Sequence, residues 1–542
     1  MHSTNFLSRM TTSLKTNLVL WISVTGALLL DLIIAWQPLS RLEFYPLLYS
    51  NGPLLDDSYI FFKMSKDLAD WFSGFYPSFR LTSGFQPLIA LLFLPFFELF
   101  WNQKETAIHL ALSLNALLGF CAHILLYGLL RRVFSRPIAT FLLSVWIWSP
   151  YVMNQTINGM ETTLASLFLL LILNYYLRFN HADSSNSRSW IMLGVLLGIG
   201  FWARVDLGLL GIAIVLDQIW FTAINNRYSP ILRVKNICMC SIIALCLASP
   251  WIVFTIINTG NILPVSGRAV HFITSTFFDF YHPDHSSFLS MMFTYFKKEF
   301  LIYQPLSALS GNILWQLTTI GMGFIGLYII VRDQKLREFY RPVWIFQMIM
   351  IIAYICFIGG FWHLNRYFYP VYTLMLLLHG ATLHWLESKL KLKPLISGAL
   401  LFILFIPYGF SYSFKHYSQW NRKCPPRYLS IALFAKDNIP SQAKVGAFQS
   451  GCVSYWLDNK VVNLDGLINE EAYAHLQNKT MDVYLANQKI DYLVEEVVLF
   501  NMWDEYLGGK LSRDYSMIKR KKEKLLPRLW QESAIYKRKT RE

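Results

Sequence analysis

Apolar and polar segments alternate along the first 413 residues of the chain. A helix needs about 20 apolar residues to cross the ~30 Å hydrocarbon core of a bilayer, and twelve segments approach that length. They cover residues 17–37, 85–101, 106–130, 138–153, 162–179, 190–203, 207–224, 236–257, 313–331, 342–361, 368–385 and 394–413. The pattern predicts a mainly α, polytopic membrane protein.

The distribution of Lys and Arg predicts which segments cross the bilayer. Five basic connections separate the apolar segments, from residues 131–136 to residues 389–393. Cytoplasmic connections are enriched in Lys and Arg, and all five lie on that side only if residues 85–101 do not cross fully. We therefore expect about eleven spans, with the N-terminus in the cytoplasm and the C-terminus outside. Residues 85–101 then form a juxtamembrane or re-entrant helix within an external loop at residues 38–105.

The composition changes after Ser413 from apolar to mixed polar. Short apolar stretches separated by turn-forming residues predict strands, and they lie at residues 444–448, 460–464 and 491–494. We expect residues 1–413 to form the membrane domain and residues 414–542 to form a small external α/β domain.

The predicted external domain ends in a basic tail at residues 519–522 and 537–539. We expect the tail to be solvated or to lie near anionic lipid headgroups. The domain also contains Cys424 and Cys452, which could pair outside the cytoplasm; their pairing is left open.

The composition supports a membrane protein and argues against a nucleic-acid partner. The 542 residues are 54% hydrophobic and 15% charged, with a mean hydropathy of +0.37, which is too apolar for a soluble protein of this size. The net charge of +15 falls largely in the connections and the tail, without the aromatic–basic pattern of a nucleic-acid surface. The sequence also lacks zinc-ligand spacing, a P-loop and a Rossmann glycine pattern.

The first candidate site residues are Asp56 and Asp57, just beyond the first predicted span. A carboxylate in the apolar region of a membrane costs on the order of 3 kcal/mol and is seldom present there without a function. The alternative is a solvated loop, or an aspartate that caps the helix predicted from Ser58. The apolar and basic residues after Ser58 favour a functional role, because they predict an amphipathic helix on the membrane surface.

Two further candidates are Glu161 and Arg204, both on the predicted external face. Glu161 follows Asn158 by three residues, which is also the spacing of a helix capping box. Arg204 and Asp206 interrupt the apolar stretch at residues 190–224, where a turn would leave Arg204 free to bind an anion. An internal Arg204–Asp206 ion pair is the alternative.

A short external connection carries His363, Arg366 and Tyr367. Arg366 could hold a phosphate by two parallel hydrogen bonds. An arginine that extends its head to the interface, beside a tyrosine of the interfacial belt, explains the same residues equally well.

In their order along the chain, these motifs resemble those of bacterial GT-C-fold glycosyltransferases that use polyprenyl-phosphate sugars. The branch with the mycobacterial terminal arabinofuranosyltransferases is the most similar. The motifs are Asp56–Ile60, Thr82–Leu88 with Gln86, Asn158–Thr162, Ala203–Gly208, Asn258–Pro264, Arg366–Pro370 and Val461–Leu467. The chain departs from the family pattern at Val205–Asp206, Ile89 and Asn463, so the resemblance indicates the reaction type but not which sugar or acceptor is used.

The resemblance implies an inverting transfer from a polyprenyl-phosphate sugar to a cell-envelope glycan, glycolipid or protein acceptor. It implies that Asp56 is the general base, that Asp57 orients the acceptor or the base, and that Arg366 or Arg204 stabilises the leaving phosphate. Substrate-binding roles follow for Asp206, His363, Tyr367, Glu161 and Gln86.

The resemblance also places the protein in the bacterial inner membrane, with the site on the external face. Enzymes of this fold differ in their use of a divalent cation, and these residues do not decide that point. Two other functions stay open. One is a polysaccharide polymerase or ligase, and the other is a transporter of lipid-linked sugars, although a transporter would need polar residues on both sides of the membrane midplane.

Overall fold

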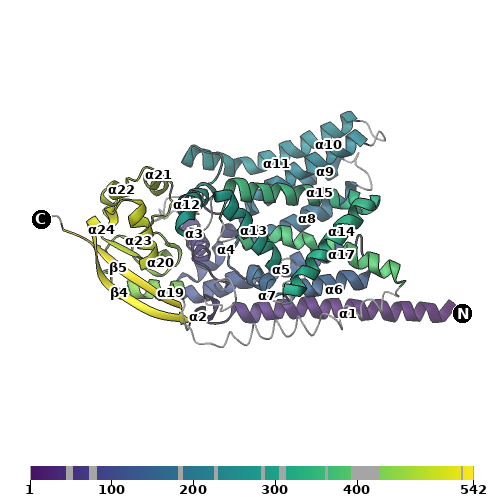
Figure 1. Ribbon diagram of the computed structural model, residues 1–542, viewed down its shortest axis with the longest axis horizontal. Helices are drawn as coiled ribbons and strands as arrows, with labels where there is room; N and C mark the ends of the chain where they lie inside the picture. Colours follow the sequence, from purple (N-terminus) through teal and green to yellow (C-terminus); the bar gives the residue numbers. More distant parts are fainter. Residues whose placement is uncertain are drawn as a thin grey trace.

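The structure is a computed structural model that describes residues 2–43, 53–72, 82–180, 187–224, 230–281, 287–303, 313–360, 364–391, 427–526 and 529–540. Helices aligned with the long axis form a bundle, and a smaller α/β domain covers one end of it (Figure 1). The N-terminus lies at the opposite end of the bundle from this domain. The predicted fold class, a mainly α polytopic protein with a small C-terminal α/β domain, is confirmed.

Four helical segments in the described part of the chain are long and apolar enough to cross a membrane. They lie in α1 (His2–Ala35), in η1 with α5 (Trp101–Gln103 and Lys104–Leu130), in α11 (Pro230–Thr259) and in α15 with the π-helical turn η4 (Gln334–Ile352 and Ala353–Ile358). Shorter apolar helices accompany them. The count of about eleven spans stays a prediction, and its last segment, residues 394–413, lies outside the described residues.

The other elements of the bundle complete the membrane domain. They are α2 (Leu39–Leu42), α3 (Asp56–Phe72), α4 (Pro87–Leu99), α6 (Arg136–Ile147), α7 (Pro150–Thr156), α8 (Thr162–Asn180), α9 (Ser187–Ala203), η2 (Val205–Leu207), α10 (Gly208–Ile224), α12 (Val265–Tyr281), α13 (Phe288–Tyr303), α14 (Ile313–Arg332), α16 (Leu364–Tyr367) and α17 (Tyr369–Lys389). Helix α4 has 13 residues and is about 20 Å long at 1.5 Å per residue, too short to cross a bilayer.

The structure differs from the sequence-based elements in two places. The apolar segment 138–153 is divided into α6 and α7 at Pro150, which has no N–H to continue the helix. The hydropathy pattern predicts a long external loop at residues 258–312, between the apolar segments 236–257 and 313–331, but this stretch contains α12 and α13. Their apolar residues alternate with polar ones, so hydropathy alone did not identify them as helices.

The C-terminal domain contains one five-stranded sheet with the order β2-β1-β3-β5-β4. The predicted strands correspond to β1 (Val445–Ala447), β2 (Val461–Asn463) and β3 (Tyr492–Glu496). The basic residues 519–522 and 537–539 of the expected tail lie in or beside the hairpin of β4 (Tyr515–Leu526) and β5 (Leu529–Arg538), and most of them are exposed. Residues 534–536 of β5 are buried and pair antiparallel with β3, which anchors the hairpin.

Helices cover this sheet and connect it to the bundle. They are α19 (Arg427–Lys436), α20 (Gly451–Trp456), α21 (Glu470–Gln477), α22 (Met481–Asn487), α23 (Val497–Tyr506) and α24 (Lys510–Asp514). The predicted domain boundary at residues 413/414 lies outside the described residues.

Aromatic residues join the α/β domain to the bundle. The Phe62 ring of α3 stacks on Phe97 of α4 with centroids 5.1 Å apart, and it meets Tyr455 of α20 edge-on at 6.0 Å. The turn before α4 also packs closely against the α/β domain, because a Cβ at Gly84 would lie only 2.1 Å from the carbonyl oxygen of Leu467. These contacts fix the α/β domain over the end of the bundle.

Candidate active site

A cavity of about 1150 Å³ lies where the bundle meets the α/β domain. One part of it is polar, and the rest is apolar and lies between α9, α10 and α11. The polar lining residues include Asp57, Gln86, Glu161, Arg204, Asp206, Arg268, His271, Arg366 and Tyr367. The structure therefore brings together most of the residues that the sequence singled out.

The lining residues that the sequence singled out come from five segments that are far apart in the sequence. Asp57 lies in the first turn of α3, Gln86 precedes α4, and Glu161 precedes α8. Arg204 and Asp206 flank the start of η2, and Arg366 and Tyr367 lie in α16. His363 lies outside the described residues.

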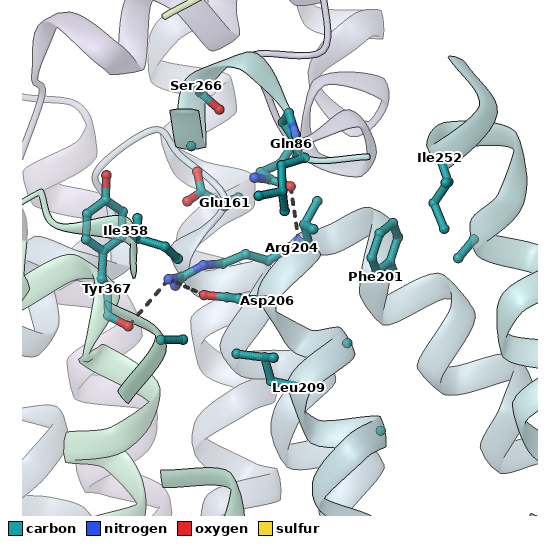
Figure 2. A pocket seen from close by; sticks show the side chains of 18 of the residues that line it. Gln86, Glu161, Phe201, Arg204, Asp206, Leu209, Ile252, Ser266, Ile358 and Tyr367 are labelled. Atoms are coloured by element: carbon teal, nitrogen blue, oxygen red, sulfur yellow. Dashed lines mark hydrogen bonds and ion pairs between the residues drawn. The ribbon is translucent and has the colours of Figure 1, made fainter. Parts of the chain in front are cut away.

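Arg204 crosses the polar part of the cavity, with Glu161 on one side and Asp206 on the other (Figure 2). Its Nη2 atom lies 2.7 Å from Asp206 Oδ2 and donates to the carbonyl of Tyr367 at 3.4 Å. Tyr354 of η4 donates its hydroxyl to Asp206 at 2.7 Å. The ion pair of the alternative interpretation is thus present. The buried Nη1 atom of Arg204 nevertheless has no hydrogen-bond partner among the described residues, so one donor remains for a ligand.

Arg366 connects α16 to the start of α3. Its Nη1 atom lies 3.1 Å from Asp57 Oδ2, and its Nη2 atom donates to the Tyr367 hydroxyl at 3.3 Å. Its buried Nε has no hydrogen-bond partner in the part of the chain that is described. Asp57 and Arg366 therefore face the same cavity, although 309 residues separate them in the sequence.

Asp56 has different surroundings from Asp57 and does not line the cavity. Its carboxylate accepts the backbone N–H groups of Gly451 at 2.9 Å and Cys452 at 2.7 Å, at the start of α20. Burial raises the pKa of Asp56 to about 6, although the two N–H donors act to lower it. The contact of Asp56 is with the α/β domain.

Glu161 follows an Asx turn rather than the capping box that its spacing also matched. The Asn158 side chain accepts the N–H of Met160 at 2.9 Å, Gly159 has a φ of +70°, and α8 begins only at Thr162. Glu161 is buried and lines the cavity, and its carboxylate makes no hydrogen bond to another described residue. It is available to a substrate hydroxyl.

Gln86 holds two of the loops around the cavity together. Its side-chain oxygen accepts the N–H of Val205 at 3.3 Å, which ties the turn before α4 to η2 (Figure 2). In the same turn, Ser83 accepts the N–H of Val265, at the start of α12, at 3.2 Å.

Sequence reasoning missed Arg268 and His271, which lie three residues apart on α12. Arg268 Nη2 donates to both carboxylate oxygens of Glu470 at 2.8 Å, and its guanidinium lies 5.3 Å from the Tyr473 ring. Arg268 Nε and His271 Nδ1 are buried without a hydrogen-bond partner among the described residues. Their spacing on one helix face was the available signal, but the segment had been expected to be a loop.

The α/β domain also contributes to the cavity wall through Leu467, Ile468 and Tyr473. Leu467 is the last residue of the seventh motif, Val461–Leu467, and Ile468 follows it directly. That motif is therefore part of the site and not only of the domain core.

The protein-family comparison matches residues 86–254 to the family of dolichyl-phosphate-mannose-protein mannosyltransferases. It matches residues 415–538 to a domain of unknown function, DUF8728. A search of curated proteins found no match.

Several solved structures are similar in fold. The Archaeoglobus fulgidus oligosaccharyltransferase in complex with Zn and sulfate has a TM-score of 0.59 and 12% identity, with 92% of this chain and 71% of that chain covered. ArnT from Cupriavidus metallidurans bound to undecaprenyl phosphate has a TM-score of 0.55 and 13% identity, with 95% and 97% covered. AglB from Archaeoglobus fulgidus in complex with an inhibitory peptide and a dolichol-phosphate has a TM-score of 0.55 and 12% identity, with 92% and 73% covered.

The chain has the GT-C fold of membrane glycosyltransferases. The predicted resemblance to GT-C glycosyltransferases, the glycosyltransferase class and the multi-pass membrane character are confirmed, whereas no comparison tests the arabinofuranosyltransferase branch.

A divalent cation, which the sequence left open, has no evident set of ligands among the residues that the structure describes. Within the described ranges, no group of three or more His, Cys, Asp or Glu residues could hold a metal ion. Asp57 and Asp206 are each bonded to an arginine. These two carboxylates therefore do not fit a metal site.

Proposed function

We propose that this protein transfers a sugar from a polyprenyl-phosphate donor to a hydroxyl of a cell-envelope acceptor, with inversion at the anomeric carbon. One observation carries the proposal. A single cavity combines buried arginine nitrogens that have open hydrogen-bonding capacity, three carboxylates (Asp57, Glu161 and Asp206), and a long apolar wall.

The phosphate of the donor is proposed to bind Arg204, Arg366 and Arg268. Each has a buried nitrogen without a partner among the described residues, and a guanidinium binds phosphate oxygens with charge-assisted hydrogen bonds. As the sugar–phosphate bond breaks, negative charge grows on these oxygens, and fixed cations in a water-poor site stabilise that charge.

The lipid tail of the donor is proposed to lie along the apolar wall. Figure 2 shows Phe201, Leu209 and Ile252 on the side of the cavity away from Glu161 and Tyr367. A polyprenyl chain is entirely apolar, so burial against such a wall is favourable. The undecaprenyl phosphate in ArnT and the dolichol-phosphate in AglB support a donor of this class.

The general base is proposed to be Asp57, in place of Asp56. Asp57 lines the cavity, whereas Asp56 is bonded to α20. The acceptor hydroxyl gives its proton to Asp57 as its oxygen attacks the anomeric carbon. The bond from that carbon to the phosphate oxygen breaks on the opposite face, and polyprenyl phosphate leaves with the bonding electron pair.

Glu161 is proposed to orient the sugar or the acceptor. It carries a second carboxylate in the polar part of the cavity, close enough to interact electrostatically with Arg204 and Arg366. Hydrogen bonds from sugar hydroxyls to Glu161 would hold the anomeric carbon in line with the attacking oxygen.

The site is proposed to face outward from the bacterial inner membrane, with the α/β domain on the external side. This orientation rests on the basic connections, which the positive-inside rule assigns to the cytoplasm. The α/β domain and the N-terminus lie at opposite ends of the molecule, in agreement with opposite sides of the membrane (Figure 1).

The test compares Asp57→Asn and Asp56→Asn strains with wild type at matched protein level, with mass spectrometry of the cell-envelope glycans and of the polyprenyl-phosphate sugars. Loss of the base is expected to lower product by about 10²- to 10⁴-fold in Asp57→Asn and to raise the unused donor. In Asp56→Asn, the side-chain amide oxygen can still accept a backbone N–H group of α20, so this variant is expected to keep more activity than Asp57→Asn. Unchanged glycans in Asp57→Asn would remove it from the base role, and an unchanged donor pool in both strains would refute the transfer reaction.

A further inference from the structure

A second cavity, of about 350 Å³, lies on the other side of α3 from the candidate active site. In α3, Asp57, Ile60 and Phe61 line the active-site cavity, whereas Lys63, Lys66 and Asp70 line the second one. At 100° per residue these two sets occupy opposite faces of the helix. The second cavity is therefore separate from the site described above.

Lysines from three segments gather in this cavity. Lys63 and Lys66 come from α3, Lys104 is the first residue of α5, and Lys460 immediately precedes β2. Only two carboxylates, Asp70 and Asp458, line it with them. The side chains of Lys63, Lys66 and Lys104 are 13%, 14% and 16% exposed, so these charges are held close together and largely out of water.

The carboxylates around the cavity do not neutralise all of its lysines. Lys66 lies 2.8 Å from Asp70 and from Glu98. Asp458 is shared between Lys104 at 3.8 Å and Lys436 at 3.3 Å. Lys460 makes no ion pair with another described residue. Lys63 is paired with Asp67. Four carboxylates (Asp67, Asp70, Glu98 and Asp458) therefore face five lysines (Lys63, Lys66, Lys104, Lys436 and Lys460), and the excess of positive charge beside the cavity is one that an anion would relieve.

The position of the cavity indicates where this anion comes from. Lys104 Nζ lies 4.7 Å from the centre of the Trp101 ring. Trp101 is also the first residue of a segment that is apolar and long enough to cross a membrane. Tryptophan at the end of a span lies at the level of the lipid headgroups, so the cavity opens where phospholipid phosphates are found.

We propose that this cavity binds a phosphate group through Lys63, Lys66, Lys104 and Lys460. The phosphate belongs either to the headgroup of an anionic phospholipid or to a free phosphate ion. The cavity volume of about 350 Å³ suits a headgroup, because ligand pockets in proteins begin at about 300 Å³. A bound phosphate would connect α3 and α5 of the bundle with the α20–β2 connection of the α/β domain.

The experiment uses the full chain in nanodiscs of phosphatidylcholine, with or without phosphatidylglycerol, and separately with millimolar inorganic phosphate. The variants are Lys460→Gln and Lys460→Glu, because Lys460 is exposed and its loss breaks no ion pair among the described residues. Lys537→Gln is the matched control, since it removes one charge from an exposed position on β5. The readouts are the phosphatidylglycerol retained in native mass spectrometry and the midpoint of thermal unfolding.

Wild type and Lys537→Gln are expected to retain phosphatidylglycerol equally. Lys460→Gln is expected to retain it about fivefold more weakly, and Lys460→Glu more weakly again. Stabilisation by inorganic phosphate without phosphatidylglycerol, lost in both Lys460 variants, would instead assign the site to a free anion. Equal retention by wild type and Lys460→Glu, with no stabilisation by phosphate, would overturn the proposal.

Discussion

At the scale of single residues, the two adjacent aspartates have different surroundings. Both follow the first helix, and the sequence assigned the leading role to Asp56. In the structure, Asp56 is held by two backbone N–H groups of α20, and Asp57 lies 3.1 Å from Arg366 in the cavity. A helix turns by 100° per residue, so neighbouring side chains face different surroundings.

The planar shape of the Arg366 guanidinium is proposed to matter for turnover, because it presents several N–H donors in one plane. In Arg366→Lys the positive charge is kept, but a single ammonium cannot bond Asp57 and a phosphate in the same fixed plane. We expect turnover to fall by about 10²- to 10³-fold with little loss of folded protein. The measurement is the rate of consumption of the polyprenyl-phosphate sugar at matched protein level.

The control for this prediction is Arg513→Lys, because Arg513 is a largely exposed residue of α24 that bonds only to surface aspartates among the described residues. Its turnover should equal that of wild type. Wild-type turnover in Arg366→Lys would show that the planar guanidinium of Arg366 is not required for the reaction.

At the scale of elements, α20 acts on the active site from the α/β domain. Its first turn holds Asp56, while Ser58 donates its hydroxyl to the carbonyl of Asn158 at 2.7 Å. The start of α3 is thus fixed on one side by α20 and on the other by the loop that carries Glu161. The orientation of Asp57 depends on both contacts.

Gly451 is the position in α20 where this contact allows no side chain. A Cβ there would lie 2.1 Å from the carbonyl oxygen of Asp56, so Gly451→Ala must displace α20 or α3. We expect a loss of about 1–3 kcal/mol in stability and a decrease in turnover, because Asp57 moves with Asp56. Thermal unfolding and the transfer rate measure the two effects.

Gly321→Ala is the matched substitution, because a Cβ at Gly321 of α14 meets nothing within 4 Å. Alanine favours a helix over glycine by about 1 kcal/mol, so this variant should be at least as stable as wild type. If Gly451→Ala behaves like Gly321→Ala in both measurements, the contact of α20 with Asp56 is not required.

At the scale of the whole molecule, buried carboxyl groups line the contact between the bundle and the α/β domain. Burial raises the pKa of Glu43 to about 7 and that of Asp56 to about 6. In the α/β domain, burial raises the pKa of Asp465 and of Glu495 to about 8, and the charge of Asp56 contributes to both. Arg427, bonded to Glu496, is a cation close enough to lower the pKa of Asp56.

These shifts predict a protein that is less stable at alkaline pH. Since the folded-state pKa values exceed the ordinary values of 3.8 and 4.5, the folded protein retains protons that the unfolded chain releases. Their stabilising contribution is complete below about pH 4 and is lost as the pH rises through 6 to 8. Thermal unfolding between pH 4.5 and pH 8.5 measures the decrease.

Glu43→Gln should reduce this pH dependence, because it removes one of the titrating groups. Glu43 accepts the N–H groups of Tyr428 and Leu429, and a glutamine oxygen can accept both. Glu505→Gln, an exposed position on α23, should leave the pH profile unchanged. A Glu43→Gln profile that coincides with wild type would exclude Glu43 as one of these groups.

Local patterns in the sequence predicted a large part of the fold. The bundle helices and the strands β1 to β3 follow from runs of apolar residues, because hydropathy and strand propensity accumulate over neighbouring positions. The hairpin β4–β5 was missed because its lysines and arginines conceal the buried residues 534–536. Helices α12 and α13 were missed because their apolar residues are interspersed with polar ones.

The sequence by itself determined that the chain is a helical membrane protein, and it supplied the order of the motifs that form the cavity. Only the tertiary structure decided that Asp57 and not Asp56 faces Arg366, and that Arg268 and His271 join them. The physical reason is that a side chain's surroundings depend on contacts between distant segments. The amides that hold Asp56 lie 395 and 396 residues further along the chain, beyond the reach of any local pattern.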